Sequence, residues 1–549
     1  MFTKLILFLL FPACLFAQTL PDSTAKKIDR IFSNYNSKTP GAAVAIIQNG
    51  QLVFKNGYGT ATLEYDIPIT SSTIFHIASL SKQVVAFSIL LLEKEGKLSL
   101  TDDIRKYLDY VPDFGKKITI QHLINHTSGL RDQWQLLAIA GWQLDDVITQ
   151  DQVIKLVSTQ KELNFNPGEQ YMYCNTGYTL LGEIVKKISG LSLREYCNKN
   201  IFLPLGMSNT HFHDNYQELV KNRAYSYYPG PKKFFRHSVL SYSTVGATSL
   251  FTTVEDEAKW LLNFETGQVG GKDLINKMFL TGVLNDNKKL DYAFGLAVNE
   301  YKGYKQISHG GADAGYRTYL SYYPEAKTGI IIFSNLATIS TGFLNSLIAD
   351  VLLPKKELAI KEEKREKADS TILKKLVGDY YAYNGERIGF SFSKGKFLVT
   401  INSQPNTASN QPLFKVDDNT YEITGLTFHF TDLNGKEMVN EFVIENAIGR
   451  QTYYRQPKAP IALNPKEYIG KYYNDETESY YSIEQVKDTL TLQHRKYPDF
   501  KLIRIAPDQF KNDTWWMDHI RFIRNKKGVV TGFEVNSGRV QHLLFRKIK

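Results

Sequence analysis

The sequence predicts an N-terminal α+β domain followed by two small all-β barrels. Short β-type runs stand at both ends of residues 20–353, and helical patterns fill the stretch between them. After a charged segment the chain changes to short strands rich in Tyr, Phe, Val and Thr, and one block of this kind repeats. Strands at both ends with helices inserted between them indicate one sheet that is completed by distant parts of the chain.

Length and composition narrow the class of protein. A chain of 549 residues is too long for one ordinary core and suggests about two to four domains. Its hydrophobic content of 43% and charged content of 22% are typical of globular proteins. The formal net charge of +10 is modest for this length, and the basic residues are spread out. Without a nucleic-acid-binding motif, we expect no nucleic-acid partner.

The N-terminus has the pattern of a secretory signal peptide. Lys4 precedes an apolar run at residues 5–11, and residues 15–17 form a small-residue cleavage site. We therefore expect residues 1–17 to be removed and the protein to be exported, periplasmic or secreted. Lipoprotein anchoring through Cys14 is the weaker alternative. No later apolar stretch is long enough for a transmembrane helix.

The first predicted elements are a pair of strands. Apolar runs at residues 43–47 and 52–54 flank Asn49-Gly50, and Asn-Gly between two apolar runs favours a β-hairpin. A buried helix then follows, with apolar residues from Val84 to Leu92 and a stop at Gly96.

Ser79 and Lys82 stand where this helix begins. Their spacing places a hydroxyl and an amine on one helical face. The free N–H groups at a helix start favour developing negative charge beside Ser79. Lys82 can act as the base that a neutral serine needs if its pKa is lowered. Chance matches remain the competing interpretation, because Ser-x-x-Lys also begins at four other serines: Ser23, Ser158, Ser391 and Ser393.

Residues 98–205 have mainly helical patterns, with a long helix over residues 177–188 that ends at Gly190. Tyr173 and Asn175 stand just before it. A tyrosine can shuttle protons if nearby cations lower its pKa from about 10, and the Asn175 amide can hold Lys82 and a substrate carbonyl. The same Tyr-x-Asn pattern in the strand at residues 472–474 keeps a purely structural interpretation open.

The strand texture returns after residue 294. Runs at residues 295–298, 316–322 and 329–333 are separated by turn residues, and residues 341–353 form a final amphipathic helix. His309, Gly310, Gly311 and Ala312 lie on or beside one of these strands. Consecutive glycines permit close approach of a substrate. The Ala312 and Ser79 N–H groups could then form an oxyanion hole, and His309 could donate to substrate or tune Tyr173. A polar turn is the alternative.

The rest of the chain divides into a charged linker at residues 354–370 and two β-barrels at residues 371–457 and 458–549. The two barrel segments share a block, at residues 376–381 and again at 468–473, and each ends with a Gly-Arg pair, Gly449-Arg450 and Gly538-Arg539. Such short strands are typical of small barrels or sandwiches. Neither segment contains residues that we interpret as catalytic.

Cysteine usage gives little support to disulfides or metal sites. Only Cys174 and Cys197 remain after signal cleavage, and we expect two buried free thiols, although a disulfide stays open. No Cys/His cluster with metal-ligand spacing and no phosphate-binding glycine loop is recognised.

Together, the ordered motifs resemble a family. Ser79-x-x-Lys82, Tyr173-x-Asn175 and His309-Gly310-Gly311 are similar to those of the serine β-lactamase and penicillin-binding protein superfamily. The resemblance is closest to the class C β-lactamase-related, S12-type group and its D-aminopeptidase-like branch. It covers about residues 25–353, and four further segments support it: residues 126–130, 167–169, 204–207 and 252–256. It implies an antiparallel sheet flanked by helices, a helical subdomain and lipocalin-like C-terminal barrels.

The resemblance also implies roles for the motif residues. Ser79 would be acylated, while Lys82 and Tyr173 would share the general-base and proton-delivery work. Asn175, Gly310 and Gly311 would bind and orient the substrate beside His309. The Ser79 and Ala312 amides would stabilise the oxyanion, and water would hydrolyse the acyl-enzyme without a cofactor or metal.

One departure from the superfamily bears on the substrate. β-Lactamases and penicillin-binding proteins usually carry Lys-Thr-Gly where this chain has His309-Gly310-Gly311. The missing lysine and threonine help to bind a substrate carboxylate, so strong β-lactamase or carboxypeptidase activity is not favoured. A histidine is familiar in the D-aminopeptidase-like branch, in which a loop of the last barrel reaches toward the cleft. Residues 512–516 are our hypothesis for that loop; a tryptophan pair in the barrel wall is the alternative.

The sequence therefore predicts an exported serine hydrolase that cleaves amide or ester bonds, as a D-aminopeptidase-like peptidase or an esterase. Its partners would be small peptide, amide or ester substrates. A cell-wall D,D-carboxypeptidase or weak class C-type β-lactamase is the alternative among enzymes. A penicillin- or peptidoglycan-binding protein with a vestigial site is the alternative outside them. The sequence does not indicate the oligomeric state.

Overall fold

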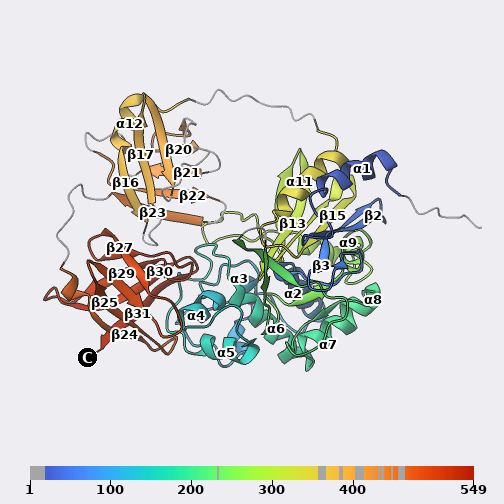
Figure 1. Cartoon of the computed structure of the whole chain (residues 1–549), viewed down its shortest axis with the longest axis horizontal. Helices are drawn as coiled ribbons and strands as arrows, with labels where there is room; N and C mark the ends of the chain where they lie inside the picture. The colour runs from blue at the N-terminus through green and yellow to red at the C-terminus, as the bar shows by residue number, and fades with distance from the viewer. Residues whose placement is uncertain are drawn as a thin grey trace, which may run out of the picture.

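The computed structural model describes ten segments of the chain (Figure 1): residues 19–231, 234–356, 366–382, 387–401, 413–423, 426–430, 433, 438–446, 449–455 and 464–548. The predicted signal peptide, with Cys14, lies outside these residues, as does most of the charged linker. Within the described segments, no helix is both long and apolar enough to cross a membrane.

A six-stranded antiparallel sheet forms the centre of the first domain, in the order β12-β13-β14-β15-β1-β2. The N-terminal strand β1 pairs with β15 from the far end of the domain, which confirms that distant parts of the chain complete one sheet. The strands are β1 (Ala42–Gln48), β2 (Gln51–Tyr58), β12 (Ala297–Tyr301), β13 (Tyr304–Asp313), β14 (Tyr316–Tyr323) and β15 (Thr328–Ser334).

The predicted hairpin joins β1 to β2. Asn49 and Gly50 have φ values of 50° and 78°, the left-handed backbone that the tight turns of two-residue hairpins require. Alternate β1 residues belong to different cores: Ala43 and Ala45 face one hydrophobic cluster, whereas Val44 and Ile46 face another. The sheet is therefore covered by helices on both faces.

Helices α1 (Asp22–Ile31) and α11 (Thr341–Leu352) pack together on one face, while α9 (Val254–Thr266) packs against β1 and β15 on the other. Helix α2 (Ser81–Lys94) is buried along almost its whole length, as expected for a helix that is apolar all round. It packs against α6 (Asn175–Ser189) in the helical region. Gly96 and Gly190, the two predicted helix stops, both have positive φ.

The helical region also holds α3 (Ile120–Ile124), α4 (Gln133–Ile139), α5 (Gln150–Ser158) and α7 (Leu193–Cys197). Cys174 and Cys197 are buried free thiols, which confirms that prediction. A small sheet of β5 (Phe75–His76), β11 (Leu250–Thr252) and β7 (His211–Phe212) was not predicted, because strands of two or three residues are too short to show alternation. Residues 295–296 lie before β12 instead of in a strand.

The C-terminal segment forms the closed barrel that the sequence predicts. Eight strands close in chain order around an aromatic core that includes Tyr472, Phe522, Phe533 and Phe545. The strands are β24 (Gly470–Asn474), β25 (Ser479–Val486), β26 (Thr489–Gln493), β27 (Phe500–Ala506), β28 (Gln509–Lys511), β29 (His519–Arg524), β30 (Val530–Ser537) and β31 (Val540–Ile548).

The preceding β segment also has eight strands, in the order β18-β17-β16-β23-β22-β21-β20-β19. Phe390 of β17 contacts Phe428 of β21 and Phe442 of β22, so the sheet curls around its own core. Within the described residues its edge strands are not paired with each other, and this sheet is a curled half-barrel. Its strands are β16 (Gly378–Ala382), β17 (Arg387–Ser393), β18 (Lys396–Ile401), β19 (Phe414–Lys415), β20 (Thr420–Ile423), β21 (Leu426–Phe430), β22 (Glu441–Asn446) and β23 (Gly449–Arg455).

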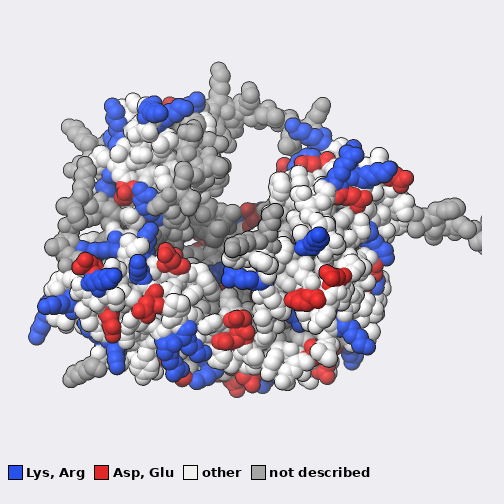
Figure 2. Space-filling model, in the orientation of Figure 1, with Lys and Arg blue, Asp and Glu red and all other residues white. Residues whose placement is uncertain are grey.

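The closed barrel packs directly on the helical region, beside α4 and α5 (Figure 1). The Tyr481 hydroxyl donates to the Ile139 carbonyl at 2.9 Å, and Arg131 donates to Glu476 at 2.6 Å with both side chains buried. Basic and acidic residues are interspersed on the face drawn in Figure 2, so that face offers no continuous basic surface.

Candidate functional site

Ser79 lies in a short 3-10 turn, η1 (Ala78–Leu80), that leads directly into α2. The preceding residue, Ala78, has a φ of 51°, a conformation that is strained for a residue with a side chain and that is frequent at functional sites. Ser79 is the one residue of η1 that is not fully buried. The turn therefore presents its hydroxyl at the start of the helix, as the sequence predicts.

Gly311 lets strand β13 approach this turn. A Cβ atom at Gly311 would lie 2.6 Å from the Ile77 carbonyl oxygen and 2.2 Å from Thr318 Oγ1. Thr318 itself donates to the Ile77 carbonyl at 2.9 Å. Only glycine fits this position without shifting the backbone of the Ser79 segment, so the glycine run serves the packing of the site as well as access to it.

The outer edge of β13 is open beside Ser79. Strand β12 pairs with β13 only up to Ser308, so the edge from His309 to Ala312 has no strand partner on that side among the described residues. Backbone N–H and C=O groups on such an edge can bind an extended substrate. Gly310, Gly311 and Ala312 line the same cleft as Ser79.

Lys82 is fully buried and makes three hydrogen bonds through its amine. Nζ donates to Ser79 Oγ at 3.0 Å, to Asn175 Oδ1 at 2.9 Å and to the Ala247 carbonyl at 2.7 Å. Burial lowers the pKa of Lys82 to about 7, with Asp132 opposing the shift and Arg539 adding to it. Near neutral pH a large share of this amine is therefore unprotonated, which is the form that can accept a proton.

Asn175, the first residue of α6, is held in place by Asp132. Its backbone N–H and its Nδ2 donate to Asp132 Oδ2 at 2.7 and 2.8 Å, which leaves Oδ1 to accept from Lys82. Asp132 caps α4 through the Trp134 N–H. The sequence predicted Asn175 but not Asp132, because an isolated aspartate before a helix is typical of any N-cap.

Tyr173 is enclosed by the His126 ring, 4.2 Å away, and by two cations. Lys82 Nζ and Arg539 Cζ lie 5.0 and 4.9 Å from its ring centroid. Burial raises the pKa of Tyr173 well above its usual value of about 10, although a hydrogen bond with Ser79 and the charge of Arg539 lower it. The condition set in the sequence analysis, that nearby cations lower the pKa of Tyr173, is therefore not met: desolvation outweighs the nearby positive charge, and the phenol stays protonated.

His309 lies on β13 with its ring 6.2 Å from that of Tyr173. Its Nδ1 contacts the Gly310 carbonyl at 2.6 Å and its Nε2 contacts the Tyr292 hydroxyl at 3.0 Å. Because a carbonyl only accepts, Nδ1 carries the proton and Nε2 accepts from Tyr292. Burial and Lys82 lower the pKa of His309 to about 4. Both nitrogens are occupied, so this neutral ring orients Tyr292 instead of donating to a substrate.

All the predicted site residues except buried Lys82 line one cleft of about 930 Å³: Ser79, Tyr173, Asn175, His309, Gly310, Gly311 and Ala312. Lys82 lies behind Ser79 and reaches it through the hydrogen bond given above. Three distant parts of the first domain thus converge, as the motif order indicates.

The C-terminal barrel supplies one wall of the cleft through Trp515, Gly538 and Arg539. The hypothesis for residues 512–516 agrees with the position of Trp515, whereas Trp516 packs against Tyr497 at 4.8 Å. Arg539 was not predicted as a site residue. The Gly538-Arg539 pair was noticed only as part of the repeat, and nothing in the local sequence indicates that this turn faces the first domain.

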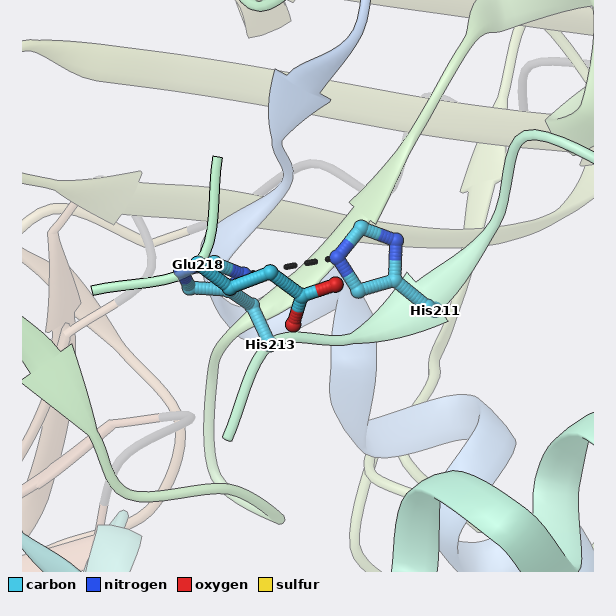
Figure 3. Close-up of side chains that lie close together, drawn as sticks. All are labelled: His211, His213 and Glu218. Carbon is cyan, nitrogen blue, oxygen red and sulfur yellow. Dashed lines mark hydrogen bonds between the residues drawn. The ribbon is translucent and has the colours of Figure 1, made fainter. Parts of the chain in front are cut away.

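One group of side chains in the described part of the chain could hold a metal ion, and it lies outside the cleft lining. His211, His213 and Glu218 offer ligand atoms within 4.8 Å of one another (Figure 3). His211 Nε2 and His213 Nδ1 are 3.4 Å apart, which is about the separation of two nitrogen ligands on a tetrahedral zinc ion. The expectation that no His cluster has metal-ligand spacing overlooked this His-x-His pair, in which His211 begins β7 (His211–Phe212) and His213 directly follows it. Residues two apart in an extended segment lie on the same face.

An arginine already occupies the carboxylate of this group. Arg194 donates to both Glu218 oxygens, at 2.5 and 2.8 Å, and also to Asp214 at 3.1 Å. The hydrogen bonds from Arg194 lower the pKa of Glu218 to about 2. A metal ion would have to share Glu218 with this guanidinium. The geometry therefore favours an ion-pair cluster over a metal site.

Comparisons with known proteins show the family to which the chain belongs. The family model described as Beta-lactamase matches residues 28–352. Penicillin-binding protein 4* of Bacillus subtilis (strain 168) is 26% identical over 443 residues, which cover 76% of this chain and 96% of the relative. The D-aminopeptidase of Brucella anthropi is 28% identical over 288 residues, 51% of this chain and 53% of that enzyme. The chain thus matches only about half the length of this second relative.

Solved structures show the same fold. The octameric penicillin-binding protein homologue from Pyrococcus abyssi has a TM-score of 0.53 at 26% identity and covers 78% of this chain and 99% of its own. The D-amino acid amidase from Ochrobactrum anthropi SV3 has a TM-score of 0.51 at 19% identity, over 60% of this chain and 98% of its own. Since the family model spans more than half of the sequence and the site motifs lie within it, the chain belongs to the Beta-lactamase family.

Proposed function

We propose that this protein is a serine hydrolase that cleaves amide or ester bonds through an acyl-enzyme on Ser79. The observation that carries the proposal is the contact between Ser79 Oγ and the Lys82 amine, 3.0 Å apart, with the pKa of Lys82 lowered to about 7 by burial. A serine is activated when a base within hydrogen-bond reach can accept its proton at neutral pH. Lys82 meets both conditions.

In the proposed reaction, Lys82 takes the Ser79 proton while Oγ attacks the substrate carbonyl carbon. The Ser79 and Ala312 N–H groups stabilise the oxyanion of the tetrahedral intermediate, an effect that typically amounts to about 3 kcal/mol per donor. Tyr173, whose phenol stays protonated, gives its proton to the leaving nitrogen or oxygen and takes one back from the Lys82 ammonium. Water then attacks the acyl carbon and gives a proton to the neutral Lys82 amine, which returns a proton to Ser79 Oγ as the acyl group leaves, so that Ser79 is regenerated.

The substrates we propose are small peptides, amides or esters, with D-aminopeptidase-like cleavage as the first candidate. Support comes from the D-aminopeptidase relatives and from His309-Gly310-Gly311 in place of Lys-Thr-Gly. A D,D-carboxypeptidase or weak β-lactamase is the second candidate, since the relative matched over most of its length is a penicillin-binding protein. We also propose export, which the predicted signal peptide at residues 1–17 supports.

A substrate panel on the mature protein tests this function. D-alanine p-nitroanilide, p-nitrophenyl esters and a chromogenic cephalosporin would be compared for the wild type and for Ser79→Ala. We expect Ser79-dependent turnover of the anilide or the esters, with a trapped acyl adduct on Ser79 by mass spectrometry. Faster turnover of the cephalosporin would favour the second candidate. If Ser79→Ala were as active as the wild type on every substrate, Ser79 would have no catalytic role. The alternative of a binding protein with a vestigial site would then be favoured.

A further inference from the structure

Three polar side chains from distant parts of the first domain meet beside the cleft. Thr248 Oγ1 donates to Asp313 Oδ2 at 2.8 Å. His76 Nε2 lies 3.1 Å from Thr248 Oγ1 and 3.2 Å from Asp313 Oδ2. Because the one hydroxyl proton goes to Asp313 and a carboxylate only accepts, Nε2 carries the imidazole proton and donates to both oxygens. We call these three residues the His76 cluster.

The His76 cluster connects the nucleophile to the proposed oxyanion hole. His76 lies in β5, three residues before Ser79, and Asp313 ends β13, directly after Ala312. Since β5 and β13 belong to different sheets, no ladder between the described strands fixes the Ser79 segment relative to the Ala312 N–H. Side chains do so instead: the contact of His76 with Asp313 adds to the contact that Thr318 makes with the same segment.

Thr248 connects the same cluster to the proposed base. It directly follows Ala247, whose carbonyl accepts from the Lys82 amine at 2.7 Å. The backbone after Thr248 is strained, because Ser249 has a φ of 72°, and such a conformation persists only where surrounding contacts hold it. The hydrogen bonds of Thr248 are contacts of this kind. The cluster therefore reaches the base as well as the nucleophile and the oxyanion strand.

The burial of His76 indicates that its role lies in the contacts of Nε2. The ring is fully buried and packs against Phe251 and Tyr316, with ring centroids 5.4 and 5.5 Å away. Its Nδ1 is buried without a hydrogen-bond partner among the described residues, which costs free energy. An apolar side chain would fill this aromatic site without that cost, so the distinctive contribution of His76 is the Nε2 donor. His76 does not line the cleft.

We propose that His76 is a positioning residue, which acts through Thr248 and Asp313 to fix the nucleophile, the base and the oxyanion strand relative to one another. This inference rests on the proposed function. An oxyanion develops only as the transition state is approached, so a displaced N–H donor loses stabilisation there while substrate binding is kept. Loss of the His76 donor therefore lowers kcat and leaves KM unchanged.

The experiment compares two substitutions of His76 with a matched change elsewhere. His76→Leu removes the Nε2 donor and keeps an apolar side chain at the buried position. His76→Gln supplies an amide N–H donor at about the reach of Nε2. His519→Leu is the control, because His519 of β29 is also buried and its Nε2 contacts Gln509 at 3.3 Å, outside the cleft lining.

Two measurements are made on each variant. The first gives kcat and KM for a p-nitrophenyl ester. The second gives the inhibition constant Ki of phenylboronic acid, whose boron accepts a lone pair of Ser79 Oγ and becomes a tetrahedral anion that resembles the intermediate. Because Ki does not depend on the fraction of the sample that is folded, a loss of stability alone leaves it unchanged.

We expect His76→Leu to lower kcat by roughly 10- to 100-fold, the effect of misplacing a reacting group by about 1 Å. KM should stay unchanged, and Ki should rise by a factor similar to the loss in kcat. His76→Gln should recover part of both effects, and His519→Leu should leave kcat, KM and Ki unchanged. A lower kcat with the wild-type Ki in His76→Leu would show a purely structural role and would overturn the inference.

A pair of threonines keeps the inference testable if His76→Leu does not fold. Thr248→Val removes the hydroxyl of the cluster. Thr210→Val is its control, because the Thr210 hydroxyl is also buried and also makes two hydrogen bonds, with Thr252 at 2.7 Å and with Asp256 at 3.0 Å. We expect only Thr248→Val to lower kcat and to raise Ki. Wild-type values of kcat and Ki in Thr248→Val would overturn the inference.

Failure of this inference is distinguishable from failure of the proposed function. Ser79-dependent hydrolysis with the same kcat and Ki in the wild type and His76→Leu would overturn the positioning role alone. If the wild type hydrolysed no ester in a Ser79-dependent way and did not bind phenylboronic acid, the proposed function would fail, and the positioning role with it.

Discussion

The two C-terminal β units come from similar sequence but take different places in the molecule. Gly378 and Gly470 both have positive φ at the start of β16 and β24, and Tyr380 and Tyr472 are both fully buried two residues later. The half-barrel has a hydrophobic cluster composed of its own residues and of the short segment that leads into it. The closed barrel shares its cluster with α4 and α5 of the first domain.

This difference shows that the residues that specify the β fold of a unit are not the residues that place the unit beside the cleft. The repeated block encodes strands and core tyrosines in both units. Docking depends instead on residues outside the block, such as Glu476, which binds Arg131, and Tyr481, which binds the Ile139 carbonyl. Because the closed barrel docks beside the cleft, its last turn can place Arg539 there. The following predictions test this comparison, from the largest expected effect to the smallest.

The same Ser-x-x-Lys tetrad occurs at Ser79, in the first domain on which the closed barrel docks, and at Ser391 in the half-barrel. Ser79→Ala should lower kcat by about 10⁴-fold or more, because loss of a serine nucleophile removes the acyl-enzyme route. Ser391→Ala, an exposed strand position, is the matched control and should have no effect on turnover. Comparable losses in the two variants would mean that the tetrad at Ser79 has no special role.

Docking of the closed barrel should depend on one buried ion pair. Arg131 and Glu476 are both buried and 2.6 Å apart, and removal of one partner of such a pair costs about 3–5 kcal/mol. Glu476→Gln should therefore lower the melting temperature. Because it loosens the barrel that forms one wall of the cleft, it should also lower kcat/KM for a p-nitrophenyl ester. Thermal unfolding and ester kinetics measure the two effects.

The control is an exposed ion pair across the same interface. Lys155 donates to Glu478 at 2.8 Å, with both side chains more than half exposed, and such pairs contribute about 0–1 kcal/mol. Lys155→Gln should leave both measurements close to the wild type. If it were as harmful as Glu476→Gln, the interface as a whole, and not the buried pair, would hold the barrel in place.

The sequence predicts the local elements of this protein better than its long-range contacts. The Asn49-Gly50 hairpin, the helix after Ser79 and the helix after Asn175 all carry their signals within a few residues. No local sequence signal marks three other residues of the site, Arg539, Asp132 and Tyr292, because each acts through a neighbour far away in the chain. The direction of the Tyr173 pKa shift was also missed, since it depends on how deeply the ring is buried and not on which cations are near in the motif.

The acid limb of the pH–rate profile should report the pKa of Lys82 and the effect of Arg539 on it. With a pKa of about 7 and an unprotonated amine required, kcat/KM should rise with pH through about 7 and then level off. Arg539 lowers the pKa of Lys82, so Arg539→Gln should move this limb to higher pH. Arg495→Gln is the control, because Arg495 is an exposed barrel arginine outside the cleft lining, and it should not move the limb. A limb at the same pH in wild type and Arg539→Gln would mean that the barrel charge is not felt by Lys82.

We expect metal ions to have the smallest effect on ester turnover. This prediction distinguishes the cleft from the His211–His213–Glu218 group. Chelation with EDTA should leave ester turnover unchanged, because the proposed proton transfers use Lys82 and Tyr173 and the group lies outside the cleft lining. Zinc should not stabilise the wild type, in which Arg194 holds both Glu218 oxygens. Arg194→Gln frees that carboxylate, so zinc should raise its melting temperature, and His213→Asn in the same background should abolish the rise. A zinc-dependent rise in the wild type would instead show that the ion and the guanidinium share Glu218.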